Sequence, residues 1–325
     1  MPDIVGAVTD QPRAWMPGQF PVQHRRRGKV QADPRSQTQP AGPSVAERLS
    51  QLYETLTTTE RKSARVLLDN YPVAGLETVA QFAARAGVSG PTVLRLIGKL
   101  GFAGYAEFQA ALRDELEARL QSPLEKHRRH REGEPGDDVE RFCAALCDNI
   151  RLSLHNIPRS ELQHTCQQLG DTRRQVFLIG GRFSDALARY FYMHLHAMRG
   201  GVRHIEPQVS AWPDYLVDIR RRDLLLMFDI RRYQQDLLRF AEHATRRGAH
   251  LILFTDQWLS PIARLARHVF PVRVQAPSSW DSSAATLALV ELLLAQLGEA
   301  DWNRVTARME SLEEMRRDLS RRDAQ

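Results

Sequence analysis

The stretch "TVAQFAARAGVSGPTVLRLIGKLG" (78–101) contains two short helical patterns separated by a turn. Gly87 lies between them and can adopt the left-handed backbone conformation that a tight turn needs, because glycine has no Cβ. Ser89 can cap the second helix, and Pro91 falls in its first turn, where a missing N–H costs nothing. The first helix packs inward through Val79, Phe82 and Ala86. This layout predicts a helix-turn-helix.

The second helix of this pair has an apolar face and a face suited to DNA. Its inward stripe is Val93, Leu96, Ile97 and Leu100. Small residues at the start of the opposite face let the backbone approach a major groove, and the basic side chains that follow can reach bases or phosphates. The residues of that face are Gly90, Pro91, Thr92, Arg95 and Lys99. Spacing alone also allows a small helical bundle that binds protein or dimerises.

The same helical patterning surrounds the pair from Ser44 onward. An amphipathic segment, "SVAERLSQLYETL" (44–56), precedes it, and Thr57 and Glu60 then have the spacing of a capping box at the start of another helix. A longer helical pattern, "FAGYAEFQAALRDELEARL" (102–120), follows the pair. We therefore predict an all-α helix-turn-helix domain over 44–120.

The segments on either side of this domain have too few apolar residues to form a packed core. Residues 1–43 are rich in Pro, Gly, Gln and Arg and show no apolar periodicity, so a disordered tail is predicted there. The charged Gly/Pro stretch "HRRHREGEPGDD" (127–138) marks a domain boundary, and we predict a linker over 121–137.

Beyond the linker, apolar strand patterns alternate with amphipathic helix patterns. The strands are predicted in "QVFLIGG", "GVRHI", "DLLLMF", "HLILFT" and "VFPVRV". Such alternation is typical of a parallel sheet covered by helices on both faces. We predict an α/β three-layer domain with a parallel sheet over 138–300 and a C-terminal helix over 301–325. The apolar segment 286–302 can pack either in this core or at a subunit interface.

Composition bounds the class of protein. The chain has 45 Lys and Arg against 39 Asp and Glu, a net charge of +6, but only four of the basic residues are Lys. We interpret this arginine bias as genomic base composition, so charge alone does not identify a DNA-binding protein. No apolar run is long enough to cross a membrane and no secretory pattern opens the chain, which predicts a cytoplasmic protein. No cofactor or metal is predicted, and Cys143, Cys147 and Cys166 are interpreted as half-buried helix residues.

The helical segments resemble a known family. "LTTTERKSARVLLDNYP" (56–72) followed by "TVAQFAARAGVSGPTVLRLIGKLGFAGYAEFQAAL" (78–112) is similar to the N-terminal domain of the RpiR/MurR transcriptional regulators. The resemblance implies binding to a double-stranded DNA operator and implies that Tyr105 and Phe108 close the core behind the recognition helix. The contact residues that it implies are Ser89, Thr92, Arg95 and Lys99. Gly90-Pro91 departs from the charged or Ala residue of many members, which bears on operator choice.

In that family the C-terminal half is a sugar isomerase (SIS) domain, with a flavodoxin-like nucleotide-binding topology, that self-associates into a homo-oligomer. "QVFLIGGRFSDALARYFYMHL" (175–195) resembles its first strand, glycine turn and helix. SIS domains that hold sugar phosphates carry a Ser-x-Ser-Gly-x-Thr loop, whereas this chain has "FDIRRYQQD" (228–236) at that position. The loss of the hydroxyl cradle and the added charge of Asp229 disfavour a conventional sugar-phosphate ligand.

Ligands of open parallel sheets bind beyond the carboxyl ends of the strands, so the loops expected there supply the effector candidates. Arginines can replace a hydroxyl cradle, since a guanidinium binds phosphate or carboxylate through two parallel hydrogen bonds. The alternative is that the two arginines of this loop pair with Asp229, Asp236 or Asp256 and stiffen a ligand-free turn. The effector candidates are Gly181, Arg182, Ser184, Asp229, Arg231, Arg232, Tyr233, Thr255 and Ser279.

These features together predict a DNA-binding transcriptional regulator whose operator binding responds to a small anionic metabolite, with a sugar phosphate less favoured. One alternative is a ligand-free regulator that uses the SIS-like domain only to dimerise. Another is a sugar-phosphate isomerase or lyase, which needs a phosphate loop and an acid/base group. His204, Glu206 and His243 are available, but no constellation singles them out. We therefore predict that the protein is not an enzyme.

Overall fold

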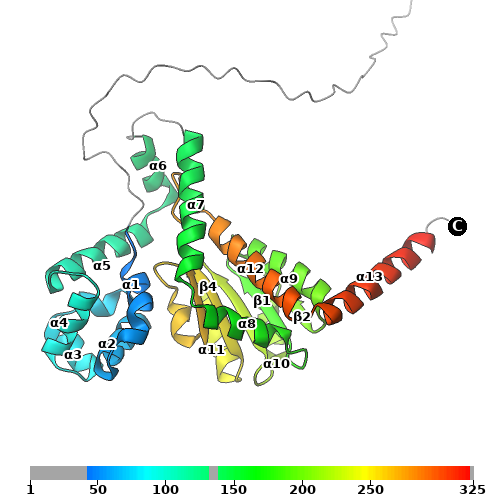
Figure 1. Cartoon of the computed structure of the whole chain (residues 1–325), viewed down its shortest axis with the longest axis horizontal. Coiled ribbons are helices and arrows are strands. Elements are labelled where there is room, and N and C mark those ends of the chain that lie inside the picture. The colour runs from blue at the N-terminus through cyan, green and yellow to red at the C-terminus, as the bar shows by residue number, and fades with distance from the viewer. Residues whose placement is uncertain (1–41, 132–137, 323–325) are drawn as a thin grey trace, which may run out of the picture. The chain divides into compact units, whose positions relative to one another are not determined.

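The structure is a computed structural model that describes residues 42–131 and 138–322 (Figure 1). The predicted tail, except for its last two residues, lies outside the described residues. Helices alone form the first part of the described chain, and an α/β domain follows. The predicted fold class, an all-α domain followed by a parallel α/β domain, is confirmed.

Five α-helices make up the helical domain. They are α1 (Val45–Leu52), α2 (Thr58–Asp69), α3 (Val79–Ala86), α4 (Gly90–Lys99) and α5 (Tyr105–Leu120), with 3-10 turns at Tyr53–Thr55 and Val73–Leu76. The helices α1, α2 and α3 each begin with a capping box, in which side chains and backbone N–H groups of the first turn satisfy one another. The predicted box of Thr57 and Glu60 is one of the three, so the helix starts follow from local sequence.

The core of this domain is built from the predicted inward positions. Phe82 on α3 and Val93, Leu96 and Ile97 on α4 are at most 1% exposed and belong to one cluster. Phe108 joins the same cluster from α5. Since these positions repeat at helical spacing, the packing of α4 against α3 and α5 follows from the apolar pattern.

The predicted linker, 121–137, contains a helix that the sequence pattern does not indicate. This helix, α6, spans Pro123–Arg131. Its charged sequence has no apolar stripe, which is why periodicity missed it. A capping signal is present nonetheless: the Ser122 hydroxyl accepts a hydrogen bond from the Glu125 backbone N–H at 3.1 Å, and the Glu125 carboxylate accepts one from the Ser122 N–H.

The α/β domain contains a five-stranded, wholly parallel sheet with the strand order β2-β1-β3-β4-β5. The strands are β1 (Val176–Gly180), β2 (Val202–His204), β3 (Leu224–Asp229), β4 (His250–Asp256) and β5 (His268–Val272). Every residue of β1 and β3 is buried, as expected for central strands covered on both faces. Val176 pairs with Leu224 and Leu224 with His250, so the amino ends of these three strands are level.

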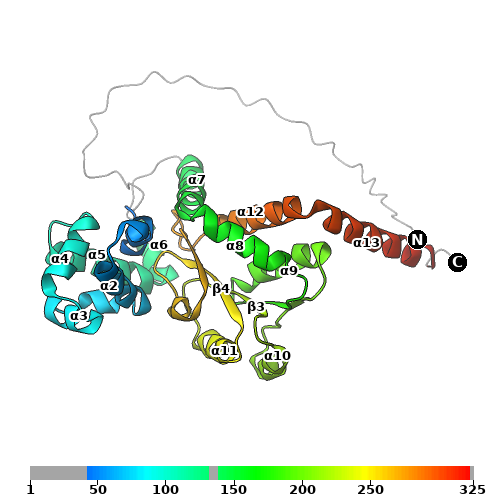
Figure 2. The same cartoon turned by 60° about the horizontal axis from the view of Figure 1, so that its bottom comes forward.

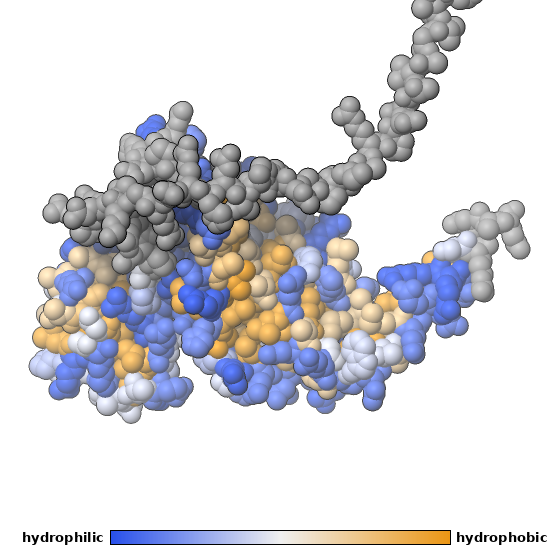
Figure 3. Space-filling model, turned by 45° about the horizontal axis from the view of Figure 1, so that its top comes forward, coloured by the Kyte–Doolittle hydropathy of each residue, from blue (hydrophilic) through white to orange (hydrophobic). Residues whose placement is uncertain are grey.

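Helices cover both faces of the sheet (Figure 2). One face carries α7 (Asp138–Asn156), α8 (Arg159–Gly170), α9 (Asp185–Met198) and α12 (Ala284–Ala300), and the other carries α10 (Trp212–Asp218) and α11 (Gln235–Arg246). Leu289 and Leu293 of α12 are fully buried in the core of this same chain, which agrees with the core alternative for the segment 286–302. The last helix, α13 (Trp302–Arg322), is mostly hydrophilic toward its C-terminal end (Figure 3).

The cysteines differ from their predicted burial. Cys143 and Cys147 are exposed on α7, and Cys166 is buried on α8, so none is half-buried. The buried positions of α7 are instead Asn149 and Ser153. Within 42–131 and 138–322, no group of three or more His, Cys, Asp and Glu residues could hold a metal ion, and no helix is long and apolar enough to span a membrane.

Two glycines of the helix-turn-helix provide a matched stability test. Gly87 ends α3 at φ +62°, a conformation that costs an L-residue roughly 1–2 kcal/mol, although no atom within 4 Å would touch an added Cβ. Gly98 lies inside α4 with equally open space, where alanine is favoured by roughly 0.5–1 kcal/mol. We expect Gly87→Ala to lower the free energy of unfolding and Gly98→Ala to raise it, as measured by urea denaturation. Changes of the same sign would contradict this account of the turn.

Candidate DNA-reading helix and effector site

The outward face of α4 begins directly after the left-handed turn. Ser89, Pro91 and Arg95 are exposed there, and Gly90 is half-buried. Thr92, by contrast, is 5% exposed. The six predicted DNA contacts therefore share one helix, but the structure leaves five of them accessible and covers Thr92.

The polar side chains at the start of α4 bond to one another. Ser89 holds the N-cap position, yet its hydroxyl lies 3.0 Å from the Thr92 hydroxyl and makes no capping bond to a backbone N–H. The Arg95 guanidinium donates to the same Thr92 hydroxyl at 3.1 Å. Thr92 thus orients Arg95 rather than presenting itself to a ligand. This is a positioning role that residue type alone did not reveal.

Lys99, the last predicted DNA contact, is tied to the helical domain. Its ammonium lies 2.7 Å from a carboxylate oxygen of Glu60, a residue that is 3% exposed. Burial alone would raise the pKa of Glu60, but hydrogen bonds from Lys99 and Thr57 lower it below its usual value. Lys99 therefore neutralises a buried carboxylate at the start of α2 while its own side chain stays partly exposed.

The first turn beyond the sheet, between β1 and α9, is held by internal hydrogen bonds. Ser184 is 7% exposed, and its hydroxyl donates to the Phe228 carbonyl at 2.6 Å. The Gly181 N–H donates to the Ser184 hydroxyl at 2.9 Å, and a Cβ at Gly181 would come within 2.9 Å of the Gln234 side-chain oxygen. The hydroxyl predicted to bind a ligand is thus occupied in joining the ends of β1 and β3.

Asp229 and Thr255 lie beneath the carboxyl edge. Asp229 is 1% exposed, accepts a hydrogen bond from the Ser260 hydroxyl through one oxygen, and has no partner for the other among the described residues. Burial raises the pKa of Asp229 to about 7, and the nearby charge of Asp256 adds to the effect. The Thr255 hydroxyl donates to the Asp229 carbonyl at 2.9 Å. The Asp229 carboxylate and the Thr255 hydroxyl are therefore buried and bonded to groups of the same chain.

Arg231 is paired with a carboxylate outside the three expected partners. Its Nε and Nη2 lie 3.0 Å and 2.6 Å from Oδ2 of Asp281, a residue of the loop after β5. The Arg231 side chain is 4% exposed and its guanidinium lies 4.8 Å from the centre of the Trp258 ring. Its Nη1 donates to the Ala118 carbonyl on α5, and Lys126 on α6 also pairs with Asp281. The expected partners Asp229, Asp236 and Asp256 do not pair with its guanidinium.

Tyr233 and Asp256 complete the buried part of this edge. The Tyr233 hydroxyl donates to Oδ1 of Asp256 at 2.7 Å, and the backbone N–H of Arg231 donates to Oδ2 at 2.7 Å. Asp256 is fully buried, and burial raises its pKa. The guanidinium of Arg119, the residue after Ala118, lies 4.4 Å from the centre of the Tyr233 ring. The loop after β3 is therefore held by hydrogen bonds to Asp256 of β4 and by contacts with Ala118 and Arg119 of α5.

The remaining effector candidates lie at the periphery. Arg232 is exposed, and the Ser279 hydroxyl lies 3.2 Å from the His127 ring. Arg182 is also exposed, with its guanidinium 5.1 Å from the centre of the Phe183 ring. Phe183 is in turn in edge-to-face contact with Trp280, and these two rings are 68% and 59% exposed. Trp280, one ring of this exposed pair, is the residue before Asp281 in the chain.

A second pair of titratable residues was not singled out from sequence. His204 at the end of β2 lies 2.9 Å from Oδ1 of Asp185, the first residue of α9. The same carboxylate oxygen accepts the Gly180 N–H at 3.3 Å. No spacing rule connects positions 185 and 204, because their proximity depends on the pairing of β1 with β2.

The comparisons with known proteins follow this division of the chain. Residues 44–119 match the helix-turn-helix domain of the rpiR family, and residues 171–296 match the SIS domain. The helical domain is therefore a helix-turn-helix domain of the kind found in the rpiR family, and the α/β domain is a SIS domain. The resemblance inferred from the sequence is therefore confirmed in both domains.

Relatives of similar length are regulators by name. An uncharacterised HTH-type transcriptional regulator from the aarA 3′ region of Providencia stuartii is 23% identical, covering 70% of this chain and 80% of its own. The HTH-type transcriptional regulator YfhH of Escherichia coli K12 is 26% identical, covering 78% and 92%. The sugar isomerase domain of an RpiR transcription factor from Sphaerobacter thermophilus superposes with a TM-score of 0.50 at 22% identity, covering 54% of this chain and 97% of that one. This last likeness supports the fold of the α/β domain.

The raised pKa of Asp229 makes a testable contribution to stability. The pKa of Asp229 is about 7 in the folded protein, above the ordinary 3.8 of an aspartate. Between these two pH values, the folded protein therefore holds a proton that the unfolded chain releases. The contribution of Asp229 to the free energy of unfolding must therefore fall as the pH rises from about 4 to about 7. We expect the stability of wild type relative to Asp229→Asn to decline over this range by about 1–4 kcal/mol, measured by chemical denaturation. A constant difference between the two proteins would contradict a protonated Asp229.

Proposed function

We propose that this regulator reads its operator through α4 and that a small organic anion changes operator binding from the carboxyl edge of the SIS domain. The observation that supports the first part is the exposed start of α4. There the backbone of Gly90 and Pro91 carries little side-chain bulk, and Arg95 is held by Thr92 on the same face. A helix of this kind presents small residues and one oriented guanidinium to a major groove.

Arg95 is the residue that best tests the DNA-reading helix. A duplex selected by the wild-type protein from a random library serves as the operator. We expect Arg95→Ala to lose specific binding by about 10–100-fold in a gel-shift assay, because an arginine paired with a base contributes roughly 1–3 kcal/mol.

Arg113→Ala provides the control for this experiment. Arg113 is exposed on α5, outside α3 and α4, so its loss removes the same charge from the same domain. We expect Arg113→Ala to retain specific binding and both variants to keep the oligomeric state of wild type. Equal affinities for Arg95→Ala and Arg113→Ala would rule out α4 as the reading helix.

The effector part of the proposal is supported by the Arg231–Asp281 pair. Arg231 offers its planar fork of donors at the position of the family's phosphate loop, and the fork is filled by a carboxylate of the same chain. An external carboxylate or phosphate has the geometry to replace the Asp281 carboxylate there. The protein would then exchange an internal anion for an external one, which avoids leaving a buried charge unpaired.

The contacts of Arg231 supply a route from this exchange to the DNA-reading domain. Its Nη1 donates to the Ala118 carbonyl, and the neighbouring Arg119 lies against Tyr233. Both Ala118 and Arg119 belong to α5, whose start packs behind α4. A ligand that draws Arg231 or Asp281 away alters these contacts, and such a difference between two states is what allosteric coupling requires.

The surroundings favour an organic anion over a sugar phosphate. The hydroxyls of Ser184 and Thr255 are occupied by the backbone carbonyls of Phe228 and Asp229. Trp280, which precedes Asp281 in the chain, is exposed and in edge-to-face contact with Phe183, and such a pair of rings suits an apolar or ring-containing portion of a ligand. We also infer that the protein is a regulator without isomerase activity and works in the cytoplasm as an oligomer on its operator.

Three variants separate the anion-exchange proposal from a ligand-free turn. Asp281→Asn removes the internal competitor, Arg231→Ala removes the fork, and Arg232→Ala removes an exposed neighbouring charge as the control. With a panel of small carboxylates and phosphates, we expect Asp281→Asn to bind the responding anion at least about tenfold more tightly than wild type, since the competing bonds are worth roughly 1.5–3 kcal/mol. Binding should be lost in Arg231→Ala and unchanged in Arg232→Ala, as measured by calorimetry.

The outcome also decides between the open alternatives. Identical anion affinities in wild type, Arg231→Ala and Asp281→Asn would place the bound anion elsewhere. If no anion binds to any of the proteins, the pair is a structural ion pair and the ligand-free regulator is the better account. The wild type and all three variants keep every arginine outside this loop, so differences among them report on this site.

A further inference from the structure

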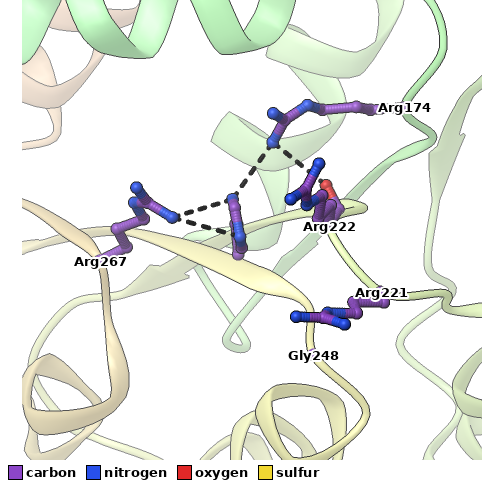
Figure 4. A pocket seen from close by; sticks show the side chains of 6 residues that line it. Arg174, Arg221, Arg222, Gly248 and Arg267 are labelled. Atoms are coloured by element: carbon purple, nitrogen blue, oxygen red, sulfur yellow. Dashed lines mark hydrogen bonds between the residues drawn. The ribbon is translucent and has the colours of Figure 1, made fainter.

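A second basic site lies at the opposite edge of the sheet. A pocket of about 480 Å³ opens where the strands begin and is lined by Arg174, Arg221, Arg222, Gly248, His250 and Arg267 (Figure 4). These residues come from the starts of four neighbouring strands, since Arg174 precedes β1, Arg222 precedes β3, His250 opens β4 and Arg267 precedes β5. All strands are parallel, so their amino ends gather these side chains at one place.

The arginines of this pocket are poorly matched by carboxylates. Among the described residues, none of the six that line it is acidic. The side chains of Arg221 and Arg222 have no hydrogen bond or ion pair within the part of the chain that the structure describes. There the side chain of Arg267 contacts the ring nitrogens of His250 and no carboxylate. The pocket therefore holds at least three guanidinium groups without a neutralising partner.

Two acids close to the pocket residues in the sequence, Asp171 and Asp223, already have partners. Asp171 pairs with Arg174 at 3.1 Å and with Arg173 at 2.8 Å, which anchors Arg174 at the rim. Asp223 is 5% exposed, and its carboxylate accepts the backbone N–H groups of Gln175 and Arg220 at 3.0 Å and 2.9 Å. Neither carboxylate is available to balance the other three arginines.

His250, at the centre of the pocket, neither neutralises the arginines nor adds a positive charge to them. Burial lowers the pKa of His250, and the charges of Arg267, Arg174 and Arg222 lower it further, so the ring is neutral at pH 7. Ring nitrogens of His250 lie 3.2 Å from Arg174 and 3.2 Å from Arg267. A neutral imidazole thus spaces two guanidinium groups that would otherwise repel each other at closer range.

The backbone of Arg222 is held in a conformation that L-residues rarely adopt. Its φ is +73°, and its N–H donates to the Gly248 carbonyl at 2.8 Å while its own carbonyl accepts from Arg174 at 3.3 Å. Such a conformation costs a non-glycine residue of order 1–3 kcal/mol and is often found at functional sites. Here it brings consecutive arginines to the pocket.

We propose that this pocket binds a compact polyanion that carries two or more linked phosphate groups, such as the phosphate chain of a nucleoside di- or triphosphate. A single phosphate carries about two negative charges, whereas four guanidinium groups converge here. Each guanidinium can bind phosphate oxygens through two parallel bonds. The volume of about 480 Å³ is within the usual range for small-molecule sites, and a recessed pocket suits a compact ligand better than an extended duplex.

Tripolyphosphate is the probe for this site. The full chain is titrated by calorimetry and thermal unfolding at constant ionic strength, with chloride as the reference salt. Arg221→Ala and Arg267→Ala are each expected to weaken tripolyphosphate binding by about tenfold or more, because each removes charge-assisted hydrogen bonds. Arg220→Ala is the matched control, since Arg220 is exposed in the same loop and does not line the pocket.

The unfolding temperature without tripolyphosphate provides a second measurement. It distinguishes loss of the site from a folding defect, because a folding defect would lower that temperature. Removing one of several unpaired like charges relieves repulsion, so Arg221→Ala and Arg267→Ala should unfold at or above the wild-type temperature in low salt. Loss of tripolyphosphate stabilisation in these two variants, with Arg220→Ala like wild type, would support the site. An equal response in all four proteins, or none in wild type, would overturn it. So would an unchanged tripolyphosphate response accompanied by weaker binding of random duplex DNA, which would make the pocket a DNA-backbone contact.

Discussion

All five strands of the sheet run in the same direction, and both candidate ligand sites depend on that constraint. Parallel pairing collects every carboxyl end at one edge and every amino end at the other. The loops that follow Gly180, Asp229 and Asp256 therefore meet around Arg231, whereas the residues that precede the strands meet around His250. The two edges differ in charge balance: the first pairs its buried arginine with Asp281, and the second leaves several arginines without carboxylates.

A buried ion pair connects the helical domain with the α/β domain. Arg273, beside β5, makes two hydrogen bonds of 2.8 Å and 3.0 Å to the Glu47 carboxylate on α1, and both side chains are less than one-tenth exposed. Desolvation offsets much of the attraction in such a pair, so its net contribution to stability is small. Losing one partner is costly, however, because a charge would remain buried without compensation. The pairs of Glu47–Arg273 and Arg231–Asp281 consequently favour one arrangement of the contacting segments over others.

Local patterns in the sequence predict the helices and strands. They cannot predict the contacts between residues that are distant in the chain. The inward stripe of α4 and the capping box of Thr57 follow from spacings of three or four residues, which periodicity detects. Arg231 and Asp281 are 50 residues apart and Glu47 and Arg273 are 226 apart, so no local pattern could pair them. The arginines that precede the strands were visible in the sequence. No local pattern marks them as a site, because only the parallel sheet brings them together.

Asp281 gives the carboxyl edge an anion that can never diffuse away. A tethered group competes with free molecules as if it were present at a fixed local concentration, commonly about millimolar for short flexible connections. Under the anion-exchange proposal, an outside molecule with the same intrinsic affinity for Arg231 would have to exceed that local concentration before it occupied Arg231 in most copies of the protein. The length and stiffness of the segment between β5 and α12 would then set the metabolite level at which the regulator responds. Sensitivity could change through that loop while the arginine itself stayed the same.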